Sequence, residues 1–305
     1  MNPLGRSGLK VSALALGTMN FGADWHGVGM IDDKTASSLI DLALERGVNL
    51  IDTADIYGRG ASEEMLGRVL KGRRKKVLLA TKLLGQMDLQ DESTGGLSAT
   101  WVARALEGSL KRLKTDHVDL YMPHGWDPRV PLEETLGALE AAVKAGKVRV
   151  LGCSNFSGEQ LANARGRLAF DQVQYSLVAR FPEGDLVPVA ERDGASLLAW
   201  SPLAGGLLSG KYADKGAAGR RSAPYAFPHV APERGEAVVA VLRRVAALEE
   251  LTCAQAALGW IMGKPFVASA VLGARTAAQL AELLDAKPLS PRAAVLLDRA
   301  SGICA

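Results

Sequence analysis

VLLATK (77–82) is the first of three consecutive stretches that set the pattern of the whole chain; SATWVARALEGSLKRLK (98–114) and HVDLYMPH (117–124) follow it. The first and third are short and mostly apolar without alternation, which is typical of parallel strands buried on both faces. The middle stretch places apolar residues on one helix face, at Val102, Leu106, Leu110 and Leu113. Together they predict a strand, a helix and a second strand parallel to the first.

The same alternation extends along the chain. Six more apolar runs have this character: ALALG (13–17), NLID (49–52), VRVLGCSN (148–155), DQVQYSL (171–177), SLLAWSPL (196–203) and SAVLGA (269–274). Helical patterns lie between and after them, at 33–46, 62–71, 132–146, 158–165, 184–193, 234–249, 252–263 and 276–285. Eight strand–helix units in one unbroken run predict an α/β protein built as a (β/α)8 TIM barrel, with residues 1–305 forming a single domain.

Two segments lie outside these repeats. PLGRSGLKV (3–11) has a Gly-Arg-Ser-Gly turn between apolar flanks and predicts an N-terminal β-hairpin that caps the bottom of the barrel. A C-terminal helix is expected over about residues 291–300. Long irregular segments follow strands at 18–31, 83–97 and 212–233. We expect them to overhang the C-terminal end of the barrel, which is the end that carries the chemistry in this architecture.

Composition and charge exclude several classes of protein. The chain has 36 Lys and Arg against 33 Asp and Glu, a net charge of +3 over 305 residues, which is too small to favour nucleic acid or an anionic membrane as a partner. No secretory signal and no apolar run of about 20 residues is present. The three cysteines, Cys153, Cys253 and Cys304, form no CxxC pair. These features predict a cytoplasmic protein.

Four titratable side chains follow consecutive strands at the end expected to carry the chemistry. Asp52 ends the second strand with Tyr57 close behind it, Lys82 ends the third strand, and His124 ends the fourth. Taken singly, each has a structural reading as an ion pair, a loop contact or core packing. Taken together they predict catalysis, because a cationic lysine lowers a phenol pKa from about 10 and a carboxylate holds the ammonium. Tyr57 then donates a proton while His124 orients and polarises a carbonyl oxygen.

The chain resembles the aldo-keto reductase family at the ends of five strands, in DTADIYG (52–58), ATK (80–82), LYMPHGWD (120–127), GCSNF (152–156) and WSPLAGGLLSGKY (200–212). The likeness begins with LGRSGLKVSALALGTMNFG (4–22) and ends with VLGARTAAQL (271–280), so it spans nearly the whole chain. It implies an enzyme that reduces aldehydes and ketones with NADPH. The catalytic tetrad that it implies is Asp52, Tyr57, Lys82 and His124.

The resemblance also implies contacts with the cofactor. Ser154 and Asn155 are expected to bind the nicotinamide carboxamide with Gln172 beside them, and Trp200 is expected to stack on the nicotinamide ring. The glycines of SPLAGGLLSGK (201–211) are expected to approach the diphosphate. Core packing for the tryptophan and a simple turn for the glycines are the alternatives. The full implied set is Gly17, Thr18, Met19, Asp52, Ser154, Asn155, Gln172, Trp200, Ser201, Pro202, Leu203, Gly205, Gly210, Lys211, Gly273, Arg275, Gln279 and Glu282.

The last predicted strand leads into the residues that are expected to choose the cofactor. By the resemblance, Arg275 grips the 2′-phosphate of NADPH and Gln279 reaches the adenosine. A guanidinium suits a phosphate far better than a ribose hydroxyl, so Arg275 favours NADPH over NADH, although a surface arginine is the alternative. Relatives commonly carry Glu-Asn where this chain has Glu282 and Leu283. Leucine cannot hydrogen-bond adenine, so we expect a different arrangement there.

Other nucleotide and metal motifs are rejected. Residues 205–211 match GxxxxGK, but a Walker loop needs Ser or Thr next and this chain has Tyr212. No GxGxxG follows a strand, and no His-x-His pair lies on an early strand, so neither a Rossmann turn nor a metal is expected. Cys153 should face the helices as an inert buried thiol.

The sequence therefore predicts an NADPH-dependent aldo-keto reductase acting on a small-molecule carbonyl, with reversible alcohol oxidation. Two alternatives stay open: an NADPH-binding regulatory subunit of the channel β-subunit type, and a reductase dedicated to a sugar intermediate. Candidate residues of the substrate pocket are Trp25, His26, Trp126 and Tyr225. The sequence does not determine the physiological substrate, the preferred direction or the oligomeric state.

Overall fold

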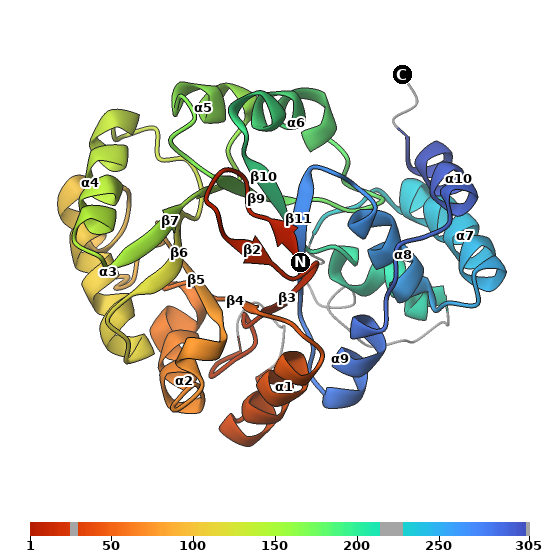
Figure 1. Ribbon diagram of the computed structural model, residues 1–305, viewed down its shortest axis with the longest axis horizontal. Helices are drawn as coiled ribbons and strands as arrows, with labels where there is room; N and C mark the ends of the chain where they lie inside the picture. Colours follow the sequence, from red (N-terminus) through yellow and green to blue (C-terminus); the bar gives the residue numbers. More distant parts are fainter. Residues whose placement is uncertain (25–29, 214–227, 303–305) are drawn as a thin grey trace.

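The computed structural model describes residues 1–24, 30–213 and 228–302. Within these ranges a ring of helices surrounds a sheet of parallel strands, and the first residues of the chain lie across the centre of the ring (Figure 1). Strands and helices alternate in the order that the apolar runs and helical patterns predict. The prediction of a (β/α)8 barrel is confirmed.

The barrel strands lie around the sheet in sequence order. Their bounds are β3 (Leu14–Gly17), β4 (Leu50–Asp52), β5 (Leu78–Leu83), β6 (Val118–Pro123), β7 (Val148–Leu151), β8 (Cys153–Ser154), β9 (Phe170–Gln174), β10 (Ser196–Trp200) and β11 (Val267–Leu272). Neighbours pair in parallel in the order β7-β6-β5-β4-β3-β11-β10-β9-β8. The residues that follow these strands therefore gather at one end of the barrel.

The strand predicted over 148–155 is interrupted at Gly152 and forms two segments, because the chain turns there from one neighbour to the other. β7 pairs with β6 and β8 pairs with β9, so the two halves of one stretch close the ring. The N–H of Gly152 bonds to the carbonyl of Tyr121 at 3.2 Å. A Cβ at position 152 would lie 2.3 Å from ring atoms of Phe170. Only glycine fits where the barrel closes.

Two apolar layers fill the protein. The inner layer lies within the barrel and is built by alternate strand residues, among them Ala15, Leu50, Ala80, Leu120, Val150, Phe170, Leu198 and Ala268. The outer layer lies between the strands and the helices and contains Cys153. Its thiol faces away from the barrel interior, as the alternation predicts. Burial, reinforced by the nearby Asp171, raises the pKa of this thiol well above its ordinary value.

The N-terminal hairpin covers the bottom of the barrel, as predicted. It consists of the antiparallel strands β1 (Asn2–Pro3) and β2 (Lys10–Val11). Leu4 and Val11 are fully buried in the inner layer. The side-chain amide of Asn2 donates to the carbonyl of Ala268 at 2.9 Å, near the start of β11. The hairpin thus closes the end of the barrel opposite the predicted site.

The helices have the bounds α1 (Asp33–Glu45), α2 (Ala61–Val69), α3 (Ala99–Leu113), α4 (Leu132–Lys144), α5 (Gly158–Asn163), α6 (Pro182–Asp193), α7 (Pro232–Leu248), α8 (Cys253–Met262), α9 (Ala277–Leu284) and α10 (Pro291–Ser301). The helix expected from residue 184 begins two residues earlier, because Pro182 is well suited to a first turn. The predicted C-terminal helix is confirmed as α10. Within the described ranges, none of the helices has the length and apolarity that crossing a membrane requires.

Helix α10 packs beside α7 at the edge of the ring and is tied to α8 (Figure 1). The carboxylate of Asp298 accepts hydrogen bonds from the indole N–H of Trp260 at 2.9 Å and from Lys264 Nζ at 2.6 Å. Lys264 also lies 4.4 Å from the centre of a Trp260 ring. The C-terminal helix is therefore anchored by a partly buried charge and not by apolar contact alone.

The closing glycine gives a test of the fold. Gly152→Ala should lower the free energy of unfolding by about 2 kcal/mol or more, because the added methyl group overlaps the buried Phe170 ring. Gly137→Ala is the control: it lies inside α4 with no atom within 4 Å of the new Cβ, and it should stabilise the protein by about 0.5–1 kcal/mol. Urea denaturation measures both, and equal effects would contradict the closure argument.

Candidate active site

A cavity of about 1220 Å³ opens at the C-terminal end of the barrel. It brings together Tyr57 and His124 with most of the residues expected to hold a cofactor. The latter are Gly17, Thr18, Met19, Asp52, Ser154, Asn155, Gln172, Trp200, Ser201, Pro202, Leu203, Gly205, Lys211, Gly273, Arg275, Gln279 and Glu282. Residues up to 265 positions apart in the chain thus face one space because every strand ends at this rim.

Lys82 lies at the centre of the predicted tetrad and is completely buried. Its Nζ is 2.8 Å from Asp52 Oδ2, 2.7 Å from the carbonyl of Thr53 and 3.4 Å from the hydroxyl of Tyr57. Burial by itself lowers the pKa of Lys82, but the Asp52 carboxylate and the Tyr57 phenol outweigh it and raise this pKa above its ordinary value. The ammonium therefore stays charged, and it favours the phenolate of Tyr57 in return.

The hydrogen-bond ladder beyond β4 places Tyr57 at this ammonium. The N–H of Thr53 bonds to the carbonyl of Ala80 at 2.9 Å, and the N–H of Asp55 bonds to the carbonyl of Lys82 at 3.0 Å. The chain then turns into the 3-10 segment Tyr57–Gly60, which leads into α2. The loop that carries the phenol is therefore held to β5 by main-chain bonds.

His124 follows β6 and lies beside Tyr57 in the cavity wall. The two rings meet edge to face with centroids 5.7 Å apart. Burial among protein atoms, followed by the charge of Lys82, lowers the pKa of His124 to about 3. The imidazole is therefore neutral near pH 7, so it can donate or accept a hydrogen bond but does not serve as a strong acid.

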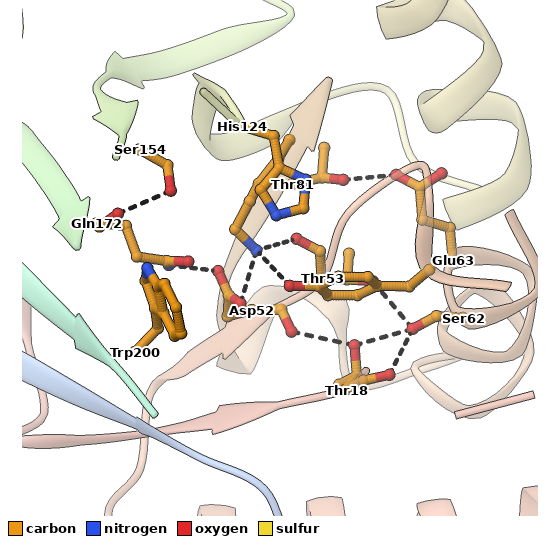
Figure 2. Close-up of polar contacts among 12 residues, drawn as sticks. Thr18, Asp52, Thr53, Ser62, Glu63, Thr81, His124, Ser154, Gln172 and Trp200 are labelled. Atoms are coloured by element: carbon orange, nitrogen blue, oxygen red, sulfur yellow. Dashed lines mark hydrogen bonds and ion pairs between the residues drawn. The ribbon is translucent and has the colours of Figure 1, made fainter. Parts of the chain in front are cut away.

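A hydrogen-bonded chain links the tetrad to the residues expected at the carboxamide. The side-chain amide of Gln172 donates to Asp52 Oδ1 at 2.7 Å, so Asp52 is held on both of its oxygens. Ser154 Oγ donates to the carbonyl of Gln172 at 2.7 Å (Figure 2). These contacts fix the end of β8 against β9 within the cavity wall.

Asn155 connects this chain to Trp200. Its Nδ2 donates to the carbonyl of His124 and to Ser154 Oγ, both at 3.0 Å, and its Oδ1 accepts the indole N–H of Trp200 at 2.8 Å. Its backbone is left-handed, with φ of 58°, a conformation that asparagine tolerates better than most residues. The Asn155 side chain, which the sequence analysis named, thereby holds the Trp200 ring in place.

Two buried hydroxyl groups beneath the tetrad, those of Thr53 and Ser62, were missed by the sequence analysis, and they cluster with Thr18, which it named. Ser62 Oγ donates to the carbonyl of Thr18 at 2.8 Å and lies 3.0 Å from Thr53 Oγ1. Thr18 Oγ1 donates to the carbonyl of Asp52 at 3.0 Å. They join the ends of β3 and β4 to the start of α2 (Figure 2). Small hydroxyl residues are common throughout the chain, so nothing in the sequence singles them out.

The glycine-rich segment after β10 bends away from the strand in left-handed turns. Gly205 and Gly206 have φ of 66° and 91° within the 3-10 segment Ala204–Ser209, and Gly210 has φ of 77°. Lys211 lines the cavity, whereas Gly210 lies just outside it. The segment therefore exposes backbone and one cation to the cavity.

Arg275, Gln279, Glu282 and Leu283 form the end of the cavity near α9. Thr276 caps the helix, and the side-chain carbonyl of Gln279 accepts the N–H of Arg275 at 3.0 Å. Within the described ranges, the guanidinium of Arg275 takes part in no ion pair. Leu283, which stands where relatives commonly carry asparagine, also lies here and presents an apolar side chain to the cavity.

The remaining predictions concern the substrate pocket. Trp126 does not line the cavity; its ring packs edge to face on Phe156 with centroids 5.3 Å apart. Trp25, His26 and Tyr225 lie outside the described residues. Lining residues that the sequence analysis did not name are Asn20, Ile56, Gly206, Ser209, Ala254, Val271, Leu272 and Ala274. Asn20 could have been noticed in the sequence, because it is an amide side chain close behind a strand end. In the structure its Nδ2 donates to the carbonyl of Ala274 at 3.0 Å.

Two buried carboxyl groups near the site have no hydrogen bond to their oxygens within the described structure: Asp55 and Asp171. Asp55 follows β4, whereas Asp171 lies on β9 beside Cys153 and points into the outer apolar layer. Burial raises the pKa of Asp55 to about 8, with a further contribution from Glu63, and burial raises the pKa of Asp171 to about 7. Both carboxyl groups hold a proton far above the pH at which an exposed aspartate loses it.

Comparison with known proteins agrees with this geometry. Residues 13–300 match the model of the aldo/keto reductase family. The chain is 38% identical to the "Uncharacterized oxidoreductase YrpG" of Bacillus subtilis (strain 168), over 94% of this chain and 90% of that protein. It is 34% identical to a "Probable voltage-gated potassium channel subunit beta" of Arabidopsis thaliana, over 94% and 91%. It is 38% identical to "Aldo-keto reductase YhdN" of Bacillus subtilis (strain 168), over 68% and 63%. The chain therefore belongs to the aldo/keto reductase family, a family of oxidoreductases.

The raised pKa of Asp171 predicts how stability depends on pH. Above about pH 4 an unfolded chain releases this proton while the folded chain keeps it to about pH 7, so ionisation works against folding as the pH rises through this window. Asp171→Asn removes the effect and should add roughly 1–4 kcal/mol to the free energy of unfolding at pH 8, and little at pH 4. Urea denaturation at both pH values measures this gain. A gain that is the same at both would mean that the carboxyl has an ordinary pKa.

Proposed function

We propose that this protein is an NADPH-dependent reductase of aldehydes or ketones, with Tyr57 as the general acid and reversible oxidation of alcohols. The observation that carries the proposal is the buried contact of Lys82 with both Asp52 and Tyr57 at the wall of a large cavity. A phenol held at a permanent positive charge is primed to release a proton. Family membership supports the same chemistry.

The cavity residues fit NADPH. The cavity volume of about 1220 Å³ exceeds the 300–1,000 Å³ that is usual for a single small ligand, which leaves room for a dinucleotide and a substrate. Trp200 would face the nicotinamide, the turns at Gly205 and Gly206 would approach the diphosphate, and Arg275 would hold the 2′-phosphate. When bound, NADPH supplies the hydride that reduces the carbonyl carbon.

Tyr57 completes the reduction by transferring its hydroxyl proton to the carbonyl oxygen. The O–H bond of the phenol breaks, an O–H bond forms on the product alcohol, and a phenolate remains. Lys82 stabilises that phenolate from 3.4 Å, while Asp52 and the carbonyl of Thr53 keep the ammonium in position. The interaction strengthens as the phenolate forms, which is the requirement for lowering a barrier.

His124 orients the carbonyl. Its depressed pKa of about 3 keeps the imidazole neutral, so it polarises the oxygen by a hydrogen bond and leaves protonation to Tyr57. The rings of His124 and Tyr57 meet edge to face, and both residues line the same cavity. A carbonyl oxygen there would meet one donor from each side.

Some relatives carry the name of potassium channel β subunits, so a regulatory NADPH-binding protein with little turnover is the second candidate. The same cavity serves both functions, and the intact contact of Lys82 with Tyr57 favours turnover. Binding and turnover therefore have to be measured separately. Tight NADPH binding without reduction of any carbonyl in a broad panel would favour the regulatory role.

Tyr57→Phe should lower kcat for carbonyl reduction by about 10²- to 10⁴-fold, because the phenol is the proton donor. NADPH affinity, measured by fluorescence titration, should stay within about threefold. Consumption of NADPH with a panel of aldehydes, ketones and keto-sugars measures the rate. Tyr212→Phe is the control, since Tyr212 is not among the described residues that line the cavity and the Lys211 ammonium lies over its ring. An unchanged kcat in Tyr57→Phe would reject Tyr57 as the general acid.

Arg275→Ala should weaken NADPH binding by about tenfold or more and leave NADH binding nearly unchanged, because only the 2′-phosphate needs the guanidinium. Calorimetric titration with each cofactor gives the two dissociation constants. Arg292→Ala, a loss of an exposed arginine at the start of α10, controls for the change of net charge. Equal losses for NADPH and NADH would mean that Arg275 does not read the 2′-phosphate.

A further inference from the structure

Asp55 lies between Asp52 and Tyr57 in the chain, yet it faces away from the cavity into the protein. It is 1% exposed, and neither carboxyl oxygen has a hydrogen bond within the described structure. Its backbone N–H is bonded to the carbonyl of Lys82 at 3.0 Å. The main chain is therefore fixed behind the tetrad, and among the described residues Asp55 is not one of those that line the cavity.

The groups that face Asp55 come from four elements. Glu63 on α2 and Arg112 on α3 form an ion pair at 2.7 Å, and Thr81 Oγ1 donates to Glu63 at 2.6 Å. Tyr121 on β6 has a buried hydroxyl that makes no hydrogen bond in the described structure, and Asp55, Glu63 and Arg112 all act on it electrostatically. Lys82 on β5 also acts on Asp55 through its charge.

The charges around this position already balance. Arg112 neutralises Glu63, and Asp52 neutralises Lys82. An ionised Asp55 would be one surplus negative charge in a region without solvent, so the carboxyl keeps its proton at neutral pH, consistent with a pKa of about 8. Loss of that proton changes the net charge behind the tetrad by one unit.

We propose that Asp55 is a positioning residue that tunes Tyr57 through its own proton: protonated, it leaves the full charge of Lys82 to act on the phenol, and ionised, it offsets part of that charge. This inference rests on the proposed function of Tyr57. It assigns the alkaline sensitivity of the site to a carboxyl that contacts neither cofactor nor substrate.

The direction in which Asp55 shifts the pKa of Tyr57 follows from electrostatics. An anion behind Lys82 disfavours the Tyr57 phenolate, so ionisation of Asp55 makes the phenol harder to deprotonate. Asp55→Asn has the same shape but cannot ionise, and it should lower the Tyr57 pKa measured in alkaline solution by about one unit. In alcohol oxidation, where Tyr57 must accept a proton, the acidic limb of kcat/KM should move to lower pH by the same amount.

The test is a titration of phenolate absorbance in the full chain without cofactor. Subtracting the titration curve of Tyr57→Phe from that of the parent isolates the titration of Tyr57. Subtracting the curve of the double variant Asp55→Asn/Tyr57→Phe from that of Asp55→Asn isolates it in the absence of the Asp55 carboxyl. Asp171→Asn is the control, because it removes an equally buried carboxyl that has no hydrogen bond to the described residues and lies on the outer side of β9. Asp55→Ser takes the place of Asp55→Asn if the latter does not fold.

A lower Tyr57 pKa in Asp55→Asn, with no change in Asp171→Asn, supports the inference even if no carbonyl is reduced, in which case only the proposed function fails. An unchanged Tyr57 pKa in Asp55→Asn overturns the inference even if the enzyme is active. Equal shifts in both variants also overturn it, because the effect would then not belong to Asp55.

Discussion

The buried ion pair of Lys82 with Asp52 is the interaction on which the rest of the site depends. A completely buried ammonium is tolerated only with a close anion and further acceptors, and Asp52 at 2.8 Å and the carbonyl of Thr53 at 2.7 Å supply both. Asp52 in turn needs its second oxygen satisfied, which Gln172 does at 2.7 Å. One charge placed in the barrel mouth thus ties together β4, β5 and β9.

The barrel makes that arrangement rigid. Parallel pairing brings the strand ends to one rim, the hairpin at the opposite end completes the inner apolar layer, and Gly152 lets one stretch of chain close the ring. Preorganised dipoles and charges stabilise developing charge without having to reorient. A rigid rim is therefore the physical condition for Lys82 to act on Tyr57 and for Trp200 to be held by Asn155.

The cavity has two chemically different ends. Near β4 and β6 it carries a phenol, a neutral imidazole and a buried ammonium, which suit proton transfer to an oxygen. Near α9 and the glycine turns it carries Lys211 and Arg275, which suit phosphate groups. Behind the first end lies a second set of buried charges, in which Asp55 is the surplus acid. One continuous cavity thus joins these two ends.

The sequence by itself determined the architecture, and it placed the four side chains of the predicted tetrad at the ends of the strands. Continuous apolar runs without alternation, separated by helical patterns, are decisive evidence for a buried parallel sheet. Titratable residues such as Asp52, Lys82 and His124 lie at the ends of those runs. Only the tertiary structure decided how the fifth strand splits at Gly152, which hydroxyl groups support the site, and that the oxygens of Asp55 are buried without hydrogen bonds to the described part of the chain. These features arise from contacts between strands and helices far apart in the chain, and no local pattern records which distant atom a side chain will meet.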